Sequence, residues 1–368
     1  MSRGLAYDKA YAFNAICPYY TMFPLEYPLR ILRKHKKIAP VVLDPFVGRG
    51  TTVYAARKLG VKSYGFDSSP IAAAIARAKL ASASLEDVLK LGKELLEASP
   101  KRVPRSGFFR RAFSENTLRE VCSLREGLQG RWSDAAEILR AAALGCLHGP
   151  LNEDASPSYF SNQMPRTFAS KPDYSVRYWK ERKLLPPNAR VLDVIERKLK
   201  RISDLNSKSF GAPKNIQCSD ARYAASFSNL PKASLTITSP PYYGMRTYVQ
   251  DQWLRMWFLG GPEEIDYINE NQLRHCGHDE FISDLARVWK NVATHSRDGA
   301  HLYVRFGTIA SAKSDAKEIM RRSLEEIGDW RIVSVRNAKS ATAGRRQADQ
   351  MGSSSKALEE FDFHAVLA

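Results

Sequence analysis

Groups that could act on a planar amine occur together in Thr238-Ser239-Pro240-Pro241-Tyr242. This segment follows the apolar run 233–237, which predicts a short buried strand. Proline fixes φ and lacks an N–H, so the carbonyls of Ser239 and Pro240 can point outward and accept hydrogen bonds. A hydroxyl, two carbonyls and an aromatic ring at a strand end suit chemistry on the exocyclic amino group of a nucleobase that has left its stack.

A second stretch with chemical potential follows the apolar run 41–43 and reads Asp44-Pro45-Phe46-Val47-Gly48-Arg49-Gly50-Thr51-Thr52. Its two glycines allow a ligand to approach the backbone closely, and Thr51 can cap the helix that follows. The next predicted strand, 62–66, ends at Asp67, where an acidic residue can accept both hydroxyls of an adenosine ribose. The dinucleotide fingerprint would place a third glycine at Val53, so the pattern favours an adenosine cofactor other than NAD.

Taken together, the two stretches resemble the amino-group DNA methyltransferases, which make N4-methylcytosine or N6-methyladenine from S-adenosylmethionine. The order of cofactor loop, long insert and catalytic motif is similar to that of the alpha group, and the resemblance covers roughly residues 11–80 and 214–368. In that group, target recognition lies between the adenine-contact motif and the catalytic motif, whereas the insert here precedes Asp220.

The resemblance assigns roles residue by residue. It implies that the catalytic residues are Ser239, Pro240, Pro241 and Tyr242. It implies that the cofactor is contacted by Tyr20, Phe23, Asp44, Phe46, Gly48, Gly50, Thr51, Thr52, Asp67, Ser68, Asp220 and Ala221.

Alternating strand and helix patterns predict an α/β fold, a doubly wound Rossmann-like methyltransferase sheet with a mostly helical insert. Residues 1–80 are expected to hold the cofactor loop, 81–213 the insert with target recognition, and 214–368 the catalytic motif. Further expected elements are helices at 24–37, 51–59, 70–81, 188–204 and 312–326, an amphipathic helix around 281–292, and strands at 38–43, 300–306, 330–336 and 361–367. No helix precedes the last strand, which is therefore expected to run antiparallel.

The positive charge of the chain is unevenly placed. Of the net +17, residues 1–80 carry 13 Lys and Arg against 4 Asp and Glu, and residues 81–215 carry 24 against 16. Residues 216–368 are balanced at 19 against 19. Such a field attracts a polyanion, and with a base-handling motif in the same chain it favours double-stranded DNA as the partner.

Residues that could read DNA lie in three segments. The region 148–175 lacks periodicity and is interpreted as a long ordered loop, and loops of this length usually bind something or are disordered. Amide and guanidinium groups read base edges. The candidate contacts are Asn162, Gln163 and Arg166 in this loop, Arg246 after the catalytic motif, and Arg345 and Arg346 before the last strand.

Other features limit the class of protein. Five cysteines without close pairing suit a reducing cytosol, and no pattern of metal ligands is complete, so no metal is predicted. No apolar run approaches a membrane span, so the expected location is the cytoplasm, at the nucleoid of a prokaryote. The resemblance also allows a cognate restriction endonuclease as a partner, while the sequence leaves the oligomeric state open.

The favoured function is site-specific methyl transfer from S-adenosylmethionine to cytosine N4 in DNA. Ser239, where many adenine enzymes of this family carry aspartate, favours cytosine, while adenine N6 is the first alternative. Carbon-5 methylation would need a Pro-Cys nucleophile, and the chain has only the reverse order, Cys17-Pro18. An RNA base methyltransferase of the tRNA-modifying kind and a non-enzymatic DNA-binding protein on a decayed scaffold are the remaining alternatives.

Overall fold

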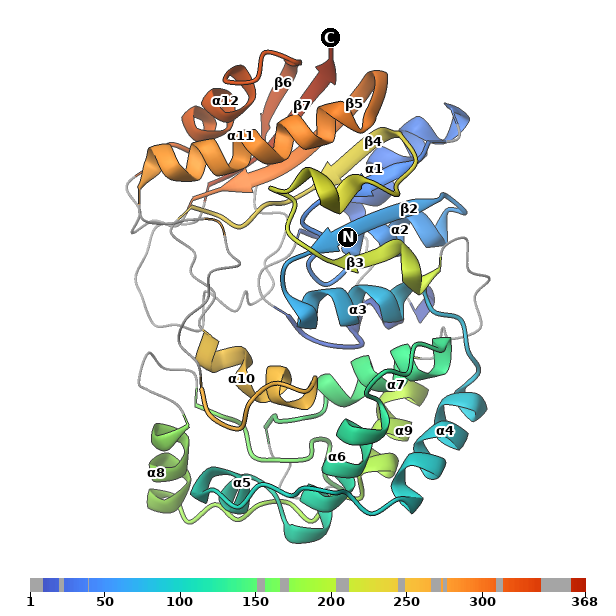
Figure 1. The fold of residues 1–368 in the computed structure, drawn as a ribbon, viewed down its shortest axis with the longest axis vertical. Helices are drawn as coiled ribbons and strands as arrows, with labels where there is room; N and C mark the ends of the chain where they lie inside the picture. The colour runs from blue at the N-terminus through green and yellow to red at the C-terminus, as the bar shows by residue number, and fades with distance from the viewer. Residues whose placement is uncertain are drawn as a thin grey trace, which may run out of the picture. The chain divides into compact units, whose positions relative to one another are not determined.

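The computed structural model describes residues 9–19, 23–38, 40–150, 156–165, 172–202, 212–243, 249–265, 273, 277–308, 314–338 and 359–368 (Figure 1). The chain divides into two compact units. Unit 1 comprises Met1–Pro18, Ala81–Lys208 and Tyr248–Asn269, and unit 2 comprises Tyr19–Leu80, Ser209–Thr247 and Glu270–Ala368.

A sheet of seven described strands forms the centre of unit 2, in the order β3-β2-β1-β4-β5-β7-β6. The strands are β1 Val42–Asp44, β2 Ser63–Asp67, β3 Ile216–Cys218, β4 Ala233–Thr238, β5 Ser296–Gly307, β6 Trp330–Asn337 and β7 Glu360–Leu367. The five strands from β3 to β5 are parallel, and β7 is antiparallel to both of its neighbours. The expected mostly parallel sheet and antiparallel last strand are therefore confirmed.

The centre of the sheet is apolar because its parallel strands are covered on both faces. Val42 and Leu43 of β1 and Leu235 and Ile237 of β4 are all buried, as continuous apolar runs in parallel sheets require. From β1 the chain first adds β2 and β3 on one side and then returns to add β4 on the other. Ligands of doubly wound sheets bind at the carboxyl ends of the strands beside such a reversal.

The helices of unit 2 pack on both faces of this sheet. They are α1 Glu26–His35, α2 Thr51–Lys58, α3 Pro70–Leu80, α11 His278–Thr294 and α12 Ala316–Glu325, with 3-10 turns η3 Lys36–Ile38, η4 Pro213–Asn215 and η5 Ala224–Phe227. Leu302, Val304 and Phe306 of β5 share one core with α11 and α12. The alternate residue Tyr303 bonds His35 of α1 on the opposite face.

Unit 1 is helical, as expected for the insert. Its elements are η2 Lys9–Ala15, α4 Leu85–Glu97, α5 Gly107–Ala112, α6 Glu115–Gly127, α7 Asp134–Leu144, α8 Asp173–Glu181, α9 Val191–Arg201 and α10 Val249–Phe258. The side chains of Ser84, Ser114 and Ser133 cap α4, α6 and α7 by accepting backbone N–H bonds. None of the helices in the described part of the chain combines the length and apolar character needed to cross a membrane.

The structure differs from the sequence expectations in three places. Residues 1–18 and 248–269 belong to the same compact unit as the insert. The segment 248–269 joins that unit because Trp253 and Trp257 of α10 pack against Phe108 and Phe109. Helix α8 begins inside the segment interpreted as a loop. Thr51 is the first residue of α2, and the N-cap is Gly50, with φ of 77°.

Candidate active site

The two motif-bearing strands lie side by side at the carboxyl edge of the sheet. Strands β1 and β4 pair in parallel, with Leu43 opposite Thr236. At their ends the Thr238 hydroxyl donates to Asp44 Oδ1 at 2.6 Å, and both side chains are buried. The Thr52 hydroxyl makes a second link between the two segments by donating to the Ile237 carbonyl at 3.1 Å. The predicted cofactor loop and the predicted catalytic segment therefore begin next to each other, although 194 positions separate Asp44 from Thr238.

The loop between β1 and α2 has a conformation that glycine permits. Gly48 and Gly50 have φ of 49° and 77°, a region that residues with a Cβ rarely adopt. A Cβ on Gly50 would lie 2.9 Å from Ala76 Cα, so α2 and α3 can approach closely only with glycine here. The loop thus presents its backbone at the strand edge.

Asp67 links the end of β2 to this loop. Its Oδ2 accepts from the Gly48 N–H at 2.9 Å, and its Oδ1 accepts from the Ser69 N–H at 2.9 Å. Burial raises the pKa of Asp67 to about 6; the two backbone bonds oppose that shift and the nearby charge of Asp220 adds to it. An ionised Asp67 retains lone pairs for further donors such as ribose hydroxyls.

The Asp44 carboxyl is also held in an unusual environment. Burial raises its pKa to about 6, while hydrogen bonds from Thr238, Thr52 and the Phe46 backbone lower it. Oδ1 accepts the Phe46 N–H at 3.2 Å as well as the Thr238 hydroxyl. Asp44 therefore fixes the geometry of the loop and the β4 end together.

The acidic residue after β3 is held by an arginine. Asp220 accepts from the Arg222 guanidinium, with Nη2 to Oδ2 at 2.7 Å, and Arg222 Nη1 also donates to Asp284 of α11 at 3.0 Å. The neighbouring Ala221 carbonyl accepts from Asn291, again on α11, at 3.0 Å. The loop that the resemblance assigns to adenine contact is thus fixed to α11.

Ser219 is a candidate contact that the sequence reasoning missed. Its N–H donates to the Asp67 carbonyl at 3.0 Å, and it immediately precedes Asp220. Its hydroxyl oxygen is buried and has no hydrogen-bond partner among the described residues. Buried hydroxyls are normally bonded, so this oxygen marks a place where a ligand could supply the missing partner. A serine before an acidic residue is too common a pair to signal this from sequence.

The predicted catalytic segment begins immediately after the end of β4 at Thr238. Ser239 is half-buried, Pro240 is buried and Pro241 is exposed. Tyr242 is 7% exposed, and its ring packs edge-on against Phe306 at 5.9 Å between centroids. In this arrangement most of the Tyr242 ring is covered by protein.

Of the remaining predicted cofactor residues, four are described by the structure and one is not. Phe46 packs edge-on against Trp289, Phe23 packs against Tyr27, and Thr51 is buried, while Ser68 is half-buried after β2. Tyr20 lies outside the described residues.

Two of the predicted nucleic-acid contacts, Asn162 and Gln163, lie among the described residues of unit 1. Asn162 in unit 1 is 1% exposed and donates from its amide to the Leu185 carbonyl at 3.1 Å. The backbone carbonyl of Gln163 accepts from Trp179 Nε1 at 3.0 Å. In this conformation Asn162 holds the loop together and offers no surface to a base edge. Arg166, Arg246, Arg345 and Arg346 lie outside the described residues.

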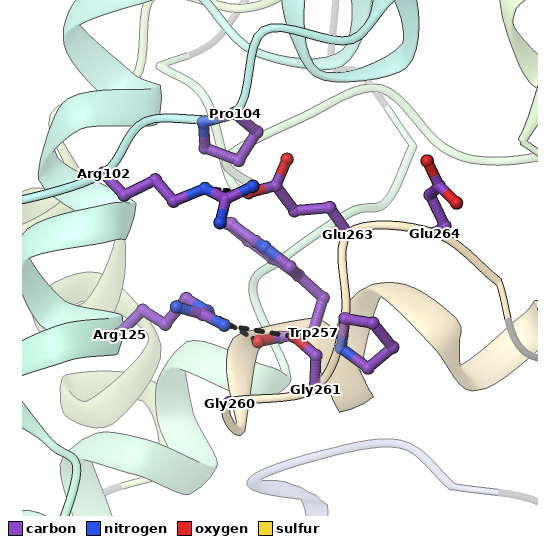
Figure 2. Close-up of a pocket in the computed structure, with 9 residues that line it drawn as sticks. Arg102, Pro104, Arg125, Trp257, Gly260, Gly261, Glu263 and Glu264 are labelled. Carbon is purple, nitrogen blue, oxygen red and sulfur yellow. Dashed lines mark hydrogen bonds and ion pairs between the residues drawn. The ribbon is translucent and has the colours of Figure 1, made fainter.

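A pocket of about 470 Å³ lies within unit 1 (Figure 2). Arg125 crosses it and donates to the carbonyls of Trp257 and Gly261, while Arg102 pairs with Glu263 at 2.8 Å. The guanidinium of Arg125 is thus bonded by protein carbonyls, and no lining residue belongs to the motifs described above.

Comparison with known proteins connects these residues to a family. Residues 7–78 match the N6/N4 methyltransferase family model, described as DNA methylase. A stretch of 84 residues is 34% identical to the type II methyltransferase M.MjaII of Methanocaldococcus jannaschii. That stretch is 23% of this chain and 15% of the relative, so the relationship covers a small part of either protein.

Solved structures show only remote likeness. The rRNA methyltransferase AviRa of Streptomyces viridochromogenes is 11% identical with a TM-score of 0.32, over 95% of this chain and 87% of that one. A structure reported for the conversion of a disulfide bond into a thioacetal group in echinomycin biosynthesis is 10% identical with a TM-score of 0.37, over 99% and 93%. Neither likeness is close enough to support an inference.

Over residues 7–78 the chain is therefore similar to the N6/N4 amino-group DNA methylases, and over 84 residues it is distantly similar to M.MjaII.

Proposed function

We propose that this protein is an S-adenosylmethionine-dependent DNA methyltransferase that acts on the exocyclic amino group of a flipped base. The observation that carries the proposal is the 2.6 Å hydrogen bond from Thr238 to Asp44, because it joins the family's cofactor loop to the Ser239–Tyr242 segment at one sheet edge. Neither segment alone would support a transfer reaction, since cofactor and acceptor must meet in one place.

The residues at this edge fit an adenosine cofactor. The positive-φ glycines allow close approach, and Asp67 can accept ribose hydroxyls. The buried Ser219 hydroxyl has no partner within the described part of the chain, and a nucleoside could provide one. Asp220 is the proposed acceptor for the adenine amino group. When bound, S-adenosylmethionine supplies an electrophilic methyl group on a sulfonium ion.

The catalytic segment prepares the acceptor nitrogen. The lone pair of an exocyclic amine is delocalised into the base, so the nitrogen is a weak nucleophile until its hydrogens are held out of the ring plane. We assign this task to the Ser239 hydroxyl and the Pro240 carbonyl, each accepting one amino hydrogen. Positioning and hydrogen bonding then supply most of the rate enhancement, and the protein forms no covalent bond to the base.

Tyr242 is the proposed clamp on the face of the base. Its ring is packed against Phe306, so clamping would use its remaining exposed surface or a rotation of the ring away from Phe306. Aromatic stacking stabilises an extrahelical base by about 1–3 kcal/mol.

The preferred base is cytosine, with N4 as the acceptor. A serine hydroxyl at position 239, in place of the aspartate of many adenine enzymes in this family, supports cytosine, while adenine N6 is the alternative within the same class. Duplex DNA is the proposed partner, with unit 1 providing target recognition, and a cognate restriction endonuclease would be consistent with the type II enzyme to which the chain is related.

The experiment uses the purified full chain with methyl-labelled S-adenosylmethionine. Isothermal titration with S-adenosylhomocysteine first measures cofactor binding, and label transfer to mixed-sequence duplex DNA is then compared with transfer to tRNA. Label in DNA supports the proposal. Label in tRNA alone would assign the protein to RNA modification, and a chain that binds no cofactor would not be an enzyme of this class.

A further inference from the structure

Arg222 bridges two acids in unit 2. Its Nε lies 3.1 and 3.0 Å from the two oxygens of Asp220, its Nη2 donates to Oδ2 at 2.7 Å, and its Nη1 donates to Asp284 at 3.0 Å. The side chains of Arg222, Asp220 and Asp284 are 11%, 15% and 0% exposed. Ion pairs of this depth are weakly screened and hold their members in one arrangement.

The bridge is anchored on α11. Asp284 and Asn291 lie seven residues apart, which places them on one face of the helix two turns apart. Asp284 holds the Arg222 side chain, and Asn291 holds the Ala221 carbonyl. The loop 220–222 is therefore fixed at both a side chain and a backbone oxygen by the same helix face.

The contacts leave Asp220 with little free acceptor capacity. An ionised carboxylate has about four lone-pair positions. Three N–H groups of Arg222, the backbone, Nε and Nη2, point at Asp220. About one acceptor position therefore remains for a ligand, in a direction set by the guanidinium.

We propose that Arg222 is a positioning residue that holds Asp220 as a directed acceptor for one amino hydrogen on the adenine of the cofactor. The inference rests on the function proposed above and extends it to a residue outside the recognised motif. Arginine suits the role because its planar fork fixes a carboxylate in two contacts, whereas lysine offers a single point charge.

The test compares two probes that differ at one group, S-adenosylhomocysteine and its 6-oxo analogue, S-inosylhomocysteine. Isothermal titration of wild-type protein should show a preference for the 6-amino compound. Arg222→Lys keeps the charge beside Asp284 but loses the fork. We expect it to weaken binding of S-adenosylhomocysteine by about tenfold and to bring the ratio between the two probes close to one.

Arg305→Lys is the matched control. Arg305 also binds a carboxylate with two nitrogens, at 2.7 and 2.9 Å to Asp362, and is buried in the same unit. The Arg305→Lys variant should lose thermal stability to a similar extent as Arg222→Lys, while its ratio of affinities for the two probes stays at the wild-type value. If Arg222→Lys does not fold, the double variant Arg222→Gln/Asp284→Asn is measured instead. It removes the guanidinium charge together with the fully buried carboxylate of Asp284 and leaves Asp220 in place.

A variant that binds both probes more weakly but keeps the wild-type ratio would overturn the positioning role and leave the proposed function intact. Equal binding of the two probes by wild-type protein would overturn it as well, because Asp220 would then not read the amino group. A wild-type chain that binds neither probe would overturn the cofactor proposal itself.

Discussion

Single residues at the sheet edge divide into those that hold the site and those proposed to react. Asp44 and Thr238 bond each other inside the protein and hold two strand ends together. Ser239 is half-buried and is the residue that follows Thr238. This division predicts that substitutions in the two groups will affect different measurements.

Replacing the proposed reacting groups should stop turnover without loss of cofactor. Ser239→Ala removes one acceptor for an amino hydrogen, so we expect kcat to fall by about a hundredfold or more, while the affinity for S-adenosylhomocysteine stays within a factor of about two. Single-turnover methyl transfer measures the loss of rate, and isothermal titration measures the affinity for S-adenosylhomocysteine. Wild-type turnover in Ser239→Ala would contradict the assigned mechanism.

Cofactor binding should depend on pH through Asp67. Burial raises its pKa to about 6, so it is protonated at pH 5 and ionised at pH 7.5. The ionised form is the better acceptor for ribose hydroxyls, so affinity for S-adenosylhomocysteine should rise through pH 6 and then level off. Asp67→Asn should bind at least about tenfold more weakly at pH 7.5 and show a flatter profile, and an unchanged profile in this variant would exclude Asp67 as the titrating group.

The stability of the ligand-free protein should fall as the pH rises, whereas the cofactor affinity should increase. Asp44 and Asp67 both have pKa values raised from 3.8 to about 6. A raised folded-state pKa contributes stability that is fully present below the unfolded value and is lost as the pH rises through the folded value. These two groups should therefore lower the unfolding free energy between about pH 4 and pH 7, which chemical denaturation across that range measures.

Among helices and strands, the α2–α3 contact at Gly50 is the point where local conformation and packing coincide. Gly50→Ala forces a Cβ into the left-handed region and to 2.9 Å from Ala76 Cα. Gly299→Ala is the matched control, because φ there is 70° and nothing lies within 4 Å of its Cβ. Gly299→Ala should cost about 1–2 kcal/mol, and Gly50→Ala about 1–3 kcal/mol more from overpacking. Equal losses of unfolding free energy would show that α3 moves aside freely.

Elements with strong local signals were predictable from sequence. The apolar runs before Asp44 and Ser239 predicted β1 and β4, and the periodicity of Phe281–Val292 predicted α11. Each of these patterns is visible within the element, because it marks the residues of that element that are buried. Helix α10 was missed because it is stabilised by aromatic packing with distant residues, in which Trp253 and Trp257 contact Phe108 and Phe109. Among the residues that the structure describes, the start of α8 has no comparable long-range aromatic contact; Trp179, near the end of that helix, packs on Phe108.

The candidate site was predictable only as far as its motifs. The glycine loop, Asp67 and the Ser239–Tyr242 segment carry recognisable residue types at strand ends. The Arg222–Asp284 pair depends on how α11 and β3 pack, and so does the burial of the Ser219 hydroxyl, for which the contacts of the described segments show no partner; such packing leaves no local pattern in the sequence. Asn162 shows the converse, because its side-chain amide is of a type that reads base edges, yet it is buried and donates to the Leu185 carbonyl.

For the molecule as a whole, the placement of charge predicts strongly salt-dependent binding of DNA. The chain carries +17, all of the excess within residues 1–215. Neutralising six or more phosphates lowers affinity on the order of a thousandfold between about 50 and 200 mM salt. Fluorescence anisotropy with a labelled duplex measures this, and S-adenosylhomocysteine binding over the same range serves as the control, which should change little. A DNA affinity that does not change with salt concentration would contradict the electrostatic contribution assigned to DNA binding.

The most direct test of the account is the chemical position of the transferred methyl group. Duplex DNA methylated by the full chain is digested to nucleosides and analysed by mass spectrometry against standards. We expect N4-methylcytosine; N6-methyladenine would keep the reaction at an exocyclic amino group while changing the preferred base. Methyl on carbon 5 of cytosine would contradict it, because that reaction needs a covalent nucleophile in place of hydrogen-bond acceptors at Ser239 and Pro240.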